Sequence, residues 1–422
     1  PRPAAFILSI GDKKPPRDKS TLRWQAALRW NEFMRLARQE NPPRDHMTAD
    51  SVNSDAAARA DAIAAILYSG GTSGKTKGIL LSNRAFNALA DMTARVCDAI
   101  TPGKKMLAVM PIFHGFGLGI CIHTALVHGV TCLLVPRFTV KTYLGHLKKS
   151  RPNFIAGVPT LFEALLRLPG TEKLDLSMLD GVFSGGDTMP ESLLTRVNEF
   201  LRARRAPARV REGYGLTECV TVCCLTPEGA HGTEAGCIGE PLFGMSVKIT
   251  EQGSTREAPA GDVGEICVSG PTVMEGYDGD AEETRSALRR HDDGRVWLHT
   301  GDLGSVGSDG FIYFRGRIKR LIISSGYSVY PYHVESVLGA HELVERCCVV
   351  GVPDEYRLQR VKAYIVLKQN APPKDEAVAA IDAYCRRALA PYNRPREFEV
   401  REALPMTPLG KVAYHTLESE TK

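Results

Sequence analysis

Ser69-Gly70-Gly71-Thr72-Ser73-Gly74-Lys75-Thr76-Lys77-Gly78 is the stretch of this 422-residue chain that decides its fold, and it directly follows the apolar run Ala62–Tyr68. Glycines let backbone N–H groups converge on an anion, the hydroxyls add donors, and the lysines add positive charge. The composition therefore predicts a loop that binds phosphate, most naturally that of a triphosphate. The residues expected to contact phosphate are Ser69, Gly70, Gly71, Thr72, Ser73, Gly74 and Lys77.

A Walker A loop is one alternative, because Gly74-Lys75-Thr76 matches the end of the G-x-x-x-x-G-K-[ST] pattern, which opens a helix. Two observations argue against it. Ser69 stands where the leading glycine should be, and the strand-like run Ile79–Leu81 follows the loop. A helix begins only near Ser82 and Asn83, which are typical helix caps. The loop is therefore predicted to join two strands, and a solvated hairpin tip is the remaining alternative.

Length and composition limit the class of protein. A chain of 422 residues with 43% hydrophobic and 24% charged residues is typical of a soluble globular protein with at least two domains. The net charge of +5 is spread out without interleaved aromatic residues, so nucleic-acid binding is not predicted. The 11 cysteines lack zinc or disulfide spacing and are expected to be reduced. No apolar run reaches the length of a membrane span, so we expect a cytoplasmic protein without integral membrane contact.

The order of the predicted elements indicates an α/β fold. Strand-like apolar runs alternate with amphipathic helices between residues 82 and 184, which is typical of a parallel sheet covered by helices. Residues 236–276 predict a β-rich part, and a smaller α/β pattern begins after residue 320. Near the start, Phe6–Ile10 predicts a core strand and Leu22–Arg38 has helical apolar spacing.

Three motifs lie where predicted strands end, which is where open α/β sheets bind ligands. Gly185-Gly186-Asp187 predicts a tight turn that lets the backbone approach a flat ring. In E-G-Y-G-L-T-E, Tyr214 can lie against a base, Thr217 can donate to a phosphate and Glu218 can offer oxygen to Mg²⁺. Asp302, at the end of W-L-H-T-G-D, can accept both hydroxyls of a ribose. A plain structural turn is the alternative for the first motif, and a strand and turn with a surface glutamate is the alternative for the second.

Taken in order, these motifs resemble the adenylate-forming superfamily, which comprises AMP-forming acyl-CoA synthetases, adenylation domains and luciferases. The phosphate loop, Y-G-x-T-E at 214–218, G-E-I-x-x-x-G at 264–270, the motif ending at Asp302 and G-R-I-K at 316–319 carry the resemblance, from about Ala62 to the C-terminus. Superfamily members have a sizeable segment before the region that corresponds to residue 1. The sequence is therefore expected to start inside a larger protein.

The resemblance implies a large core over residues 1–317, built of mixed sheets covered by helices, with a β-rich subdomain at about 230–317. It implies a small mobile α+β lid over residues 318–422. Lys319 would be the hinge between them, and Lys411, in P-M-T-P-L-G-K-V, would act in catalysis with Thr217 and Glu218. The residues implied to hold adenine and ribose are Gly185, Gly186, Asp187, Tyr214, Gly215, Asp302 and Arg317. A coenzyme A tunnel is implied at Ser325, Gly326 and Tyr327, where glycine leaves room for pantetheine.

The implied activity is ATP- and Mg²⁺-dependent conversion of a carboxylic acid to acyl-AMP, with release of pyrophosphate and transfer of the acyl group to coenzyme A. The alternatives are loading of a carrier-protein phosphopantetheine, a luciferase-like oxidation, or a nucleotide-binding relic without catalysis. Four positions depart from the superfamily pattern: Gly70 for a frequent serine, Thr76 for a frequent proline, Arg320 for an acidic residue and Tyr414 for an arginine.

The acyl substrate is expected to contact residues beside the glycine turns. These candidates are His114, Phe116, Phe183, Ser184, Leu216, Cys219 and Val220, and most are apolar. None is Lys or Arg, which disfavours a second carboxylate on the substrate. Gly115, Gly117 and Gly119 are expected to leave room for a long chain, so the sequence predicts a medium or long fatty acid.

Overall fold

The computed structural model describes residues 6–9, 26–29, 60–70, 76–135, 139–229, 236–407 and 411–421. The chain divides into two compact units, Pro1–Arg59 and Ala60–Lys422. In the first unit β1 (Phe6–Ser9) pairs in parallel with β2 (Ala26–Arg29). The strand at Phe6–Ser9 is confirmed, whereas the helix expected over Leu22–Arg38 is wrong at Ala26–Arg29, because hydrogen bonds to β1 hold this segment extended. The rest of that range lies outside the described residues.

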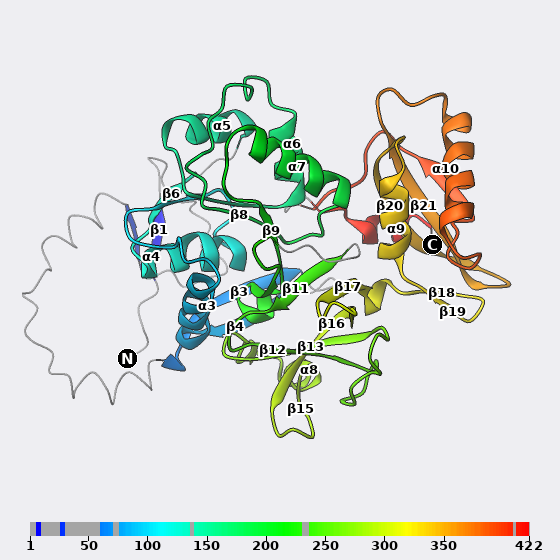
Figure 1. The fold of residues 1–422 in the computed structure, drawn as a ribbon. Helices are drawn as coiled ribbons and strands as arrows, with labels where there is room; N and C mark the ends of the chain where they lie inside the picture. Colours follow the sequence, from blue (N-terminus) through cyan, green and yellow to red (C-terminus); the bar gives the residue numbers. More distant parts are fainter. Residues whose placement is uncertain are drawn as a thin grey trace, which may run out of the picture. The chain divides into compact units, whose positions relative to one another are not determined.

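A 12-stranded sheet forms the centre of the second unit (Figure 1). Its parallel part confirms the alternating pattern and has the order β6, β5, β7, β8, β9. From β9 the sheet continues through antiparallel strands in the order β10, β11, β17, β16, β13, β12, with β15 beside β16. The bounds are β5 (Lys105–Ala108), β6 (Thr131–Leu134), β7 (Phe154–Gly157), β8 (Gly181–Gly185), β9 (Val210–Gly215), β10 (Val222–Leu225), β11 (Cys237–Pro241), β12 (Ser246–Thr250), β13 (Gly264–Ser269), β15 (Leu288–Arg290), β16 (Val296–Val306) and β17 (Ile312–Arg317).

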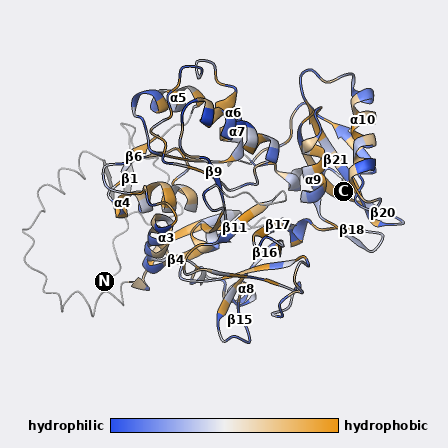
Figure 2. Cartoon of the chain, in the orientation of Figure 1, coloured by the Kyte–Doolittle hydropathy of each residue, from blue (hydrophilic) through white to orange (hydrophobic). Residues whose placement is uncertain are grey.

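Both faces of the parallel strands are buried. Figure 2 colours each residue by hydropathy, and hydrophobic residues recur in the helices that cover this sheet. Successive side chains of a strand point to opposite faces. Thus Val182 of β8 packs with α5 (Val140–Lys149), α6 (Pro159–Leu166) and α7 (Glu191–Ala203). Its neighbour Phe183 packs into the other core, which includes side chains of α3 and of the π-helical segment η1. The bounds are α3 (Asn83–Arg95), η1 (Phe116–Thr124) and α4 (Ala125–Val127).

The segment before the predicted phosphate loop and the segment after it form an antiparallel hairpin, β3 (Ile63–Gly70) and β4 (Thr76–Ser82). Ser69 lies opposite Lys77 near the loop end of the hairpin. The side chain of Ser82 then caps α3 by accepting the N–H of Ala85 at 3.3 Å. The expectation that the loop joins two strands is therefore confirmed. The loop residues Gly71, Thr72, Ser73 and Gly74 lie outside the described part of the chain.

The C-terminal part has its own sheet and core (Figure 1). Strands β18, β19, β20, β21 and β22 form it, and Val334, Leu338 and Ile381 are fully buried against it. This arrangement, together with the central sheet, confirms the α/β fold class. The bounds are η3 (Ile318–Arg320), β18 (Ile322–Ser324), β19 (Tyr327–Val329), α9 (Pro331–Ala340), β20 (Val344–Asp354), β21 (Leu358–Leu367), α10 (Lys374–Ala388), β22 (Glu397–Val400) and α11 (Tyr414–Ser419).

The glycines near His114 do not open a tunnel for a long acyl chain, so that interpretation was wrong. A Cβ on Gly115 would lie 1.6 Å from the carbonyl oxygen of Val220, and one on Gly117 would lie 2.2 Å from that of Pro111. A Cβ on Gly119 would lie 2.8 Å from the side chain of Leu89. Backbone and core atoms fill the space that these glycines leave. Their role is to let η1 pack closely against its neighbours.

Gly115→Ala is therefore expected to destabilise the protein by about 1–3 kcal/mol, because the added methyl group overlaps backbone atoms that cannot move away. Gly145→Ala is the matched control. Gly145 lies within α5, and a Cβ there would meet nothing within 4 Å. Alanine in a helix is favoured over glycine by about 0.5–1 kcal/mol, so this variant should be stabilised. Urea unfolding of both variants tests the close approach, and equal midpoints would contradict it.

Candidate active site

A buried carboxylate, that of Asp302 on β16, lies at the centre of the site. Asp302 is opposite Arg317 on β17, whose Nε is 3.0 Å from Oδ1. The hydroxyl of Tyr214, from β9, donates to Oδ2 at 2.9 Å. Burial raises the pKa of Asp302, while Arg317 and Tyr214 act to lower it. Three of the residues predicted to hold adenine and ribose are thus brought together.

Glu218 lies in the short helix η2 (Thr217–Cys219), three residues after β9 ends at Gly215. Its Oε1 accepts the hydroxyl of Tyr277, at 3.0 Å, from β14 (Gly276–Tyr277), which pairs with β4. Lys77 of β4 lies 4.9 Å from the centre of the Tyr277 ring and forms an ion pair with Glu283 of α8 (Ala281–Ala287). Tyr277 therefore links the base of the predicted phosphate loop to Glu218.

The surroundings of Glu218 fit a magnesium ion that also binds phosphate. Burial raises the pKa of this carboxyl, whereas the hydrogen bond from Tyr277 and the charge of Arg317 lower it. A carboxylate has two oxygens and can accept about four contacts, so the bond from Tyr277 leaves capacity for a cation. Mg²⁺ is typically held by one or two carboxylates together with phosphate oxygens and water.

Lys411 reaches this group from the C-terminal part of the chain. Its N–H donates to Oγ1 of Thr407 at 3.1 Å, and its carbonyl oxygen accepts the N–H of Thr407, which closes the loop that carries it. Burial lowers the pKa of Lys411, while Asp187 and Asp302 act to raise it. Burial lowers the pKa of His114, and the positive charge of Lys411 lowers it further. The predicted catalytic lysine thus lies within electrostatic reach of the predicted ribose carboxylate.

The glycine turns flank the same region. β8 ends at Gly185, and Gly186 follows with φ of +82°, a conformation that side chains rarely adopt. Gly215 ends β9, where a Cβ would lie 1.4 Å from the carbonyl oxygen of Thr221. Asp187 follows the first turn and lies within electrostatic reach of Lys411. The turns therefore place backbone rather than side chains at the ends of β8 and β9.

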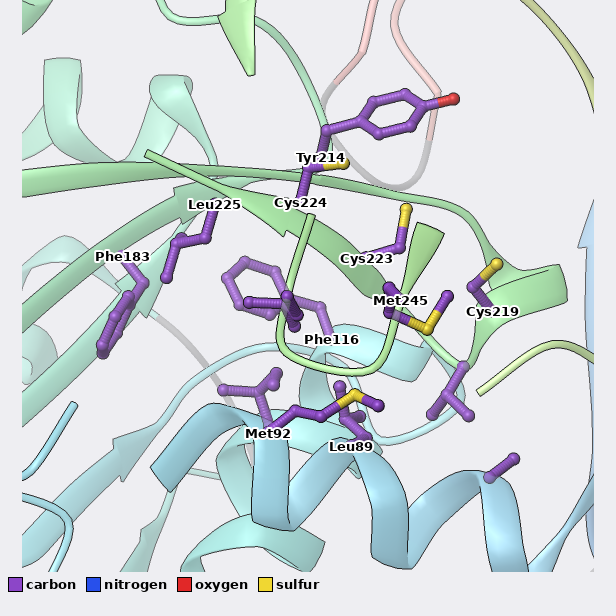
Figure 3. Packing of buried hydrophobic residues seen from close by; sticks show 14 of the residues in the cluster. Leu89, Met92, Phe116, Phe183, Tyr214, Cys219, Cys223, Cys224, Leu225 and Met245 are labelled. Atoms are coloured by element: carbon purple, nitrogen blue, oxygen red, sulfur yellow. The ribbon is translucent and has the colours of Figure 1, made fainter. Parts of the chain in front are cut away.

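The residues predicted to line an acyl pocket do not all lie on one side of the sheet. Phe116, Phe183, Cys219 and Val220 pack in one hydrophobic core, part of which Figure 3 shows. Ser184 follows Phe183 in β8 and so faces the opposite side, where its hydroxyl is buried without a hydrogen-bond partner among the described residues. His114 and Leu216 are half-buried.

The predicted hinge and coenzyme A residues lie on either side of β18. Lys319 lies in η3, between β17 and β18, and Ser325 and Gly326 form the turn to β19. Tyr327 stacks on Tyr392 with 4.6 Å between ring centres and 12° between ring planes. A cavity of about 220 Å³ opens beside them. Its lining residues are Ser324, Ser325, Tyr327, Arg357, Val361, Pro391, Tyr392, Arg394 and Arg396.

Two of the departures from the superfamily pattern contact each other. The guanidinium carbon of Arg320 lies 4.6 Å from the centre of the Tyr414 ring. Arg320 also pairs with Glu335 at 2.5 Å and donates to the carbonyl oxygen of Val349 at 3.1 Å. Arg320 thereby anchors the start of α11, three residues after Lys411. The Tyr414 ring presents an electron-rich face, which attracts a guanidinium.

Sequence reasoning missed two residues near the site. Tyr277 belongs to no recognised motif, and only the pairing of β14 with β4 reveals its contact with Glu218. Glu212 stands two residues before Tyr214 in the E-G-Y-G-L-T-E motif, but no role was predicted for it. Its Oε1 accepts the N–H of Met189 at 3.2 Å, and burial raises its pKa to about 7. The sequence did offer one signal for Glu212, because it is an acidic residue close to Tyr214, the aromatic residue of this motif.

Comparison with known proteins agrees with this geometry. The AMP-binding enzyme family matches residues 9–278, and the AMP-binding enzyme C-terminal domain family matches residues 333–411. The long-chain-fatty-acid–CoA ligase of Bacillus subtilis (strain 168) is 35% identical over 85% of this chain and 62% of its own length. The 4-coumarate–CoA ligase-like 9 of Oryza sativa subsp. japonica is 32% identical over 98% of this chain and 71% of its own. A feruloyl-CoA synthase from Amycolatopsis sp is 32% identical over 92% of this chain and 74% of its own length.

Solved structures of similar fold include ATP-bound MatB from Rhodopseudomonas palustris, with a TM-score of 0.77, 28% identity, and coverage of 86% of this chain and 68% of that one. The anthranilate CoA ligase AuaEII in complex with anthranoyl-AMP has a TM-score of 0.76, 28% identity and the same coverage. The chain spans less than two thirds of the length of the Bacillus ligase. Among the described residues, no helix combines the length and apolar composition needed to cross a membrane.

The raised pKa of Glu212 predicts a pH-dependent stability. A glutamate titrates near 4.3 in an unfolded chain, and the folded value is about 7. The folded state binds the Glu212 proton more tightly than the unfolded state does. This proton therefore contributes fully to the free energy of unfolding below about pH 4, contributes less as the pH rises, and contributes nothing above about pH 7. Glu212→Gln is neutral throughout. Its free energy of unfolding relative to the wild type should rise between pH 5 and 7, by at most about 1.4 kcal/mol per pH unit.

Urea unfolding of Glu212→Gln and the wild type across this pH range measures the difference. Glu199→Gln, on the exposed face of α7, is the control and should give a constant difference. A constant difference for Glu212→Gln as well would show that the Glu212 carboxyl is not buried as described.

Proposed function

Because this chain belongs to the AMP-binding enzyme family, we propose that it uses ATP to convert a carboxylic acid to an acyl-adenylate and then transfers the acyl group to coenzyme A. The observation that carries the proposal is the convergence of Tyr214, Asp302 and Arg317 with Lys411 at one place. A carboxylate that can accept a ribose diol, an aromatic ring for a base and a cation for a phosphate are what a bound nucleotide requires.

In the first step, an oxygen of the substrate carboxylate attacks the α-phosphorus of ATP, and the bond from this phosphorus to the oxygen shared with the β-phosphorus breaks. Pyrophosphate leaves with the electron pair of that bond. Anionic groups meet in this transition state, so positioned cations and donors supply most of the catalysis. Lys411 is proposed to stabilise this charge, and Thr217 to donate to the α-phosphate.

The nucleotide is proposed to lie between the glycine turns and the strand ends. Its adenine would lie against Tyr214 and the turn at Gly185–Asp187, with Gly215 beside it, and its ribose diol would bind Asp302 and Arg317. The phosphates would meet the loop that Ser69 and Lys77 flank. Glu218 would hold Mg²⁺, which supplies positive charge against the phosphate oxygens when bound. The hydrogen bond from Tyr277 orients Glu218 for this contact.

In the second step, the sulfur of a deprotonated thiol attacks the acyl carbon, and AMP leaves with the electrons of the acyl–phosphate bond. We propose that the C-terminal part turns about Lys319 to exchange Lys411 for the face bearing Ser325, Gly326 and Tyr327. A Cβ at Gly326 would meet nothing within 4 Å, which leaves room for a pantetheine arm.

The cavity beside this face favours coenzyme A over a carrier protein as the acceptor. It has Arg357, Arg394 and Arg396 together with the stacked rings of Tyr327 and Tyr392. Arginine matches phosphate groups, and an aromatic pair offers a face to adenine. Coenzyme A carries an adenine nucleotide with phosphate groups, whereas a carrier protein presents phosphopantetheine alone. We place the reaction in the cytoplasm, where ATP and coenzyme A are available.

The proposed acid is an apolar monocarboxylate, a medium or long fatty acid. The relative named a long-chain-fatty-acid–CoA ligase supports this assignment. Other relatives are named for coumarate and ferulate, which are aryl acids. The half-buried His114 is the proposed contact of the carboxylate end, and the half-buried Leu216 is a proposed contact of the acyl chain.

Lys411→Ala is expected to lower acyl-AMP formation by about 10²- to 10³-fold, because one charge contact in the transition state is lost. Pyrophosphate exchange measures this step. Thioester formation from supplied acyl-AMP and coenzyme A should stay within about threefold of the wild type, because Lys411 would swing away before that step. Equal losses in both steps would contradict the assignment. If the wild type binds ATP without releasing pyrophosphate, the chain is better described as a nucleotide-binding protein without catalysis. If it forms a thioester only on a carrier protein, the acceptor is a carrier-protein phosphopantetheine instead of coenzyme A.

The acid is tested with saturated fatty acids of increasing length, followed by an aryl-acid series. Each buried methylene adds about 0.8 kcal/mol, so kcat/KM for adenylation should climb with chain length and level off once the pocket is full. A profile that is flat from acetate upward, or a preference for the aryl acids, would reject a fatty acid without rejecting adenylation.

A further inference from the structure

A chain of buried hydrogen-bonding groups lies behind the turn that carries Asp302. Glu265 on β13 places Oε2 2.8 Å from Nδ1 of His299 on β16. Nε2 of His299 lies 2.9 Å from Nε2 of His291, which follows β15. Glu265, His291 and His299 are 5%, 4% and 8% exposed, so the contacts are shielded from water. These three residues are called the His291 chain below.

The direction of each hydrogen bond follows from counting protons. An ionised Glu265 only accepts, so Nδ1 of His299 donates to it. In a neutral imidazole the other nitrogen is then an acceptor, so Nε2 of His291 donates to Nε2 of His299. Nδ1 of His291 keeps a lone pair, and it is buried without a partner among the described residues. Burial lowers the pKa of His291, and Lys248 and His299 lower it further, whereas Asp293 and Asp292 raise it. The lowered pKa favours the neutral imidazole of His291.

The other oxygen of Glu265 holds the turn itself. Oε1 accepts the N–H of Gly301 at 3.0 Å. Gly301 has φ of +70°, so this turn depends on glycine and on the contacts around it. Oγ1 of Thr300 accepts the N–H of Asp302 at 3.0 Å and donates to the carbonyl oxygen of Ile266 at 2.7 Å. Hydrogen bonds of Glu265 and Thr300 therefore hold this turn against β13. The turn immediately precedes Asp302, whose carboxylate contacts Tyr214 and Arg317.

A metal ion is the competing explanation, because Cys267, His291 and His299 offer ligand atoms within 4.8 Å of one another. The contacts argue against it. Sγ of Cys267 lies 3.5 Å from Nδ1 of His299, whereas His291 meets Nε2 of the same ring. One ion binds one nitrogen of an imidazole and so cannot use both contacts. The 2.9 Å between the two Nε2 atoms is also shorter than the roughly 3.3 Å between nitrogen ligands of a tetrahedral zinc site.

From this geometry we propose that His291 and His299 are positioning residues for the nucleotide: through Glu265 and Gly301 they orient Asp302 toward the ribose diol. The proposal rests on the proposed function, because it needs a nucleotide at Asp302. His291 closes the chain at its outer end, where its ring stacks on Trp297 with 5.7 Å between centres. Loss of His291 frees Nε2 of His299, and His299 can then turn away from Glu265.

The test measures binding of ATP and of 2′,3′-dideoxy-ATP, which lacks the ribose hydroxyls, by calorimetry on the full chain. The wild type should prefer ATP. His291→Leu should reduce this preference about fivefold to tenfold, the equivalent of one well-placed hydrogen bond. His291→Gln, which keeps an N–H donor for His299, should hold the preference within about twofold. His128→Leu removes a ring that contacts the carbonyl oxygen of Ala90, remote in sequence from the turn, and should keep the full preference.

An unchanged preference in His291→Leu would overturn the positioning role while leaving the proposed function intact. Failure of the wild type to bind ATP would instead count against the proposed function. Equal loss of affinity for both nucleotides in His291→Leu would indicate a general structural role and would also overturn the proposal. If His291→Leu does not fold, His291→Asn gives the same comparison, because its polar side chain is too short to reach His299.

Discussion

The burial of the Asp302 carboxylate is the constraint on which the rest of the site depends. A carboxylate that is 3% exposed is costly unless charges and donors compensate for lost water. Arg317 and Tyr214 supply this compensation from two other strands. The central sheet must therefore hold β9, β16 and β17 in fixed register at this point, although β9 lies three strands away from β17. A ligand diol at Asp302 would be recognised by a carboxylate whose orientation is already set.

The same pairing connects the site with the C-terminal part. Arg317 is the last residue of β17, and η3 with Lys319 begins at the next residue. A rotation about η3 would therefore start next to a residue that is fixed by Asp302. Lys411 approaches the pair from the far end of the chain, in a loop closed by Thr407. In the proposed rotation, Arg317 would keep its place beside Asp302 while Lys411 leaves.

The sequence was sufficient for the fold class and for residues that act through a local motif. The strand, loop and strand order at 62–82 followed from apolar runs and a serine cap, and Tyr214 and Asp302 followed from glycine turns at strand ends. The contact of Tyr277 with Glu218 was not predictable, because it needs β14 to pair with β4 across about 200 residues. Ser184 was grouped with Phe183 by proximity in sequence, although neighbours in a strand face opposite sides. The role of Gly115 depends on the distance to Val220, which composition does not reveal.

The contact between Arg320 and Tyr414 lies beside the proposed hinge and joins η3 to α11. Arg320 is held by Glu335 and by the carbonyl oxygen of Val349, so its charge is already compensated within the C-terminal part. An arginine at position 414 would add a second cation against this guanidinium, whereas the Tyr414 ring presents its electron-rich face at 4.6 Å. Because Tyr414 begins α11 three residues after Lys411, this contact fixes the segment that carries the lysine.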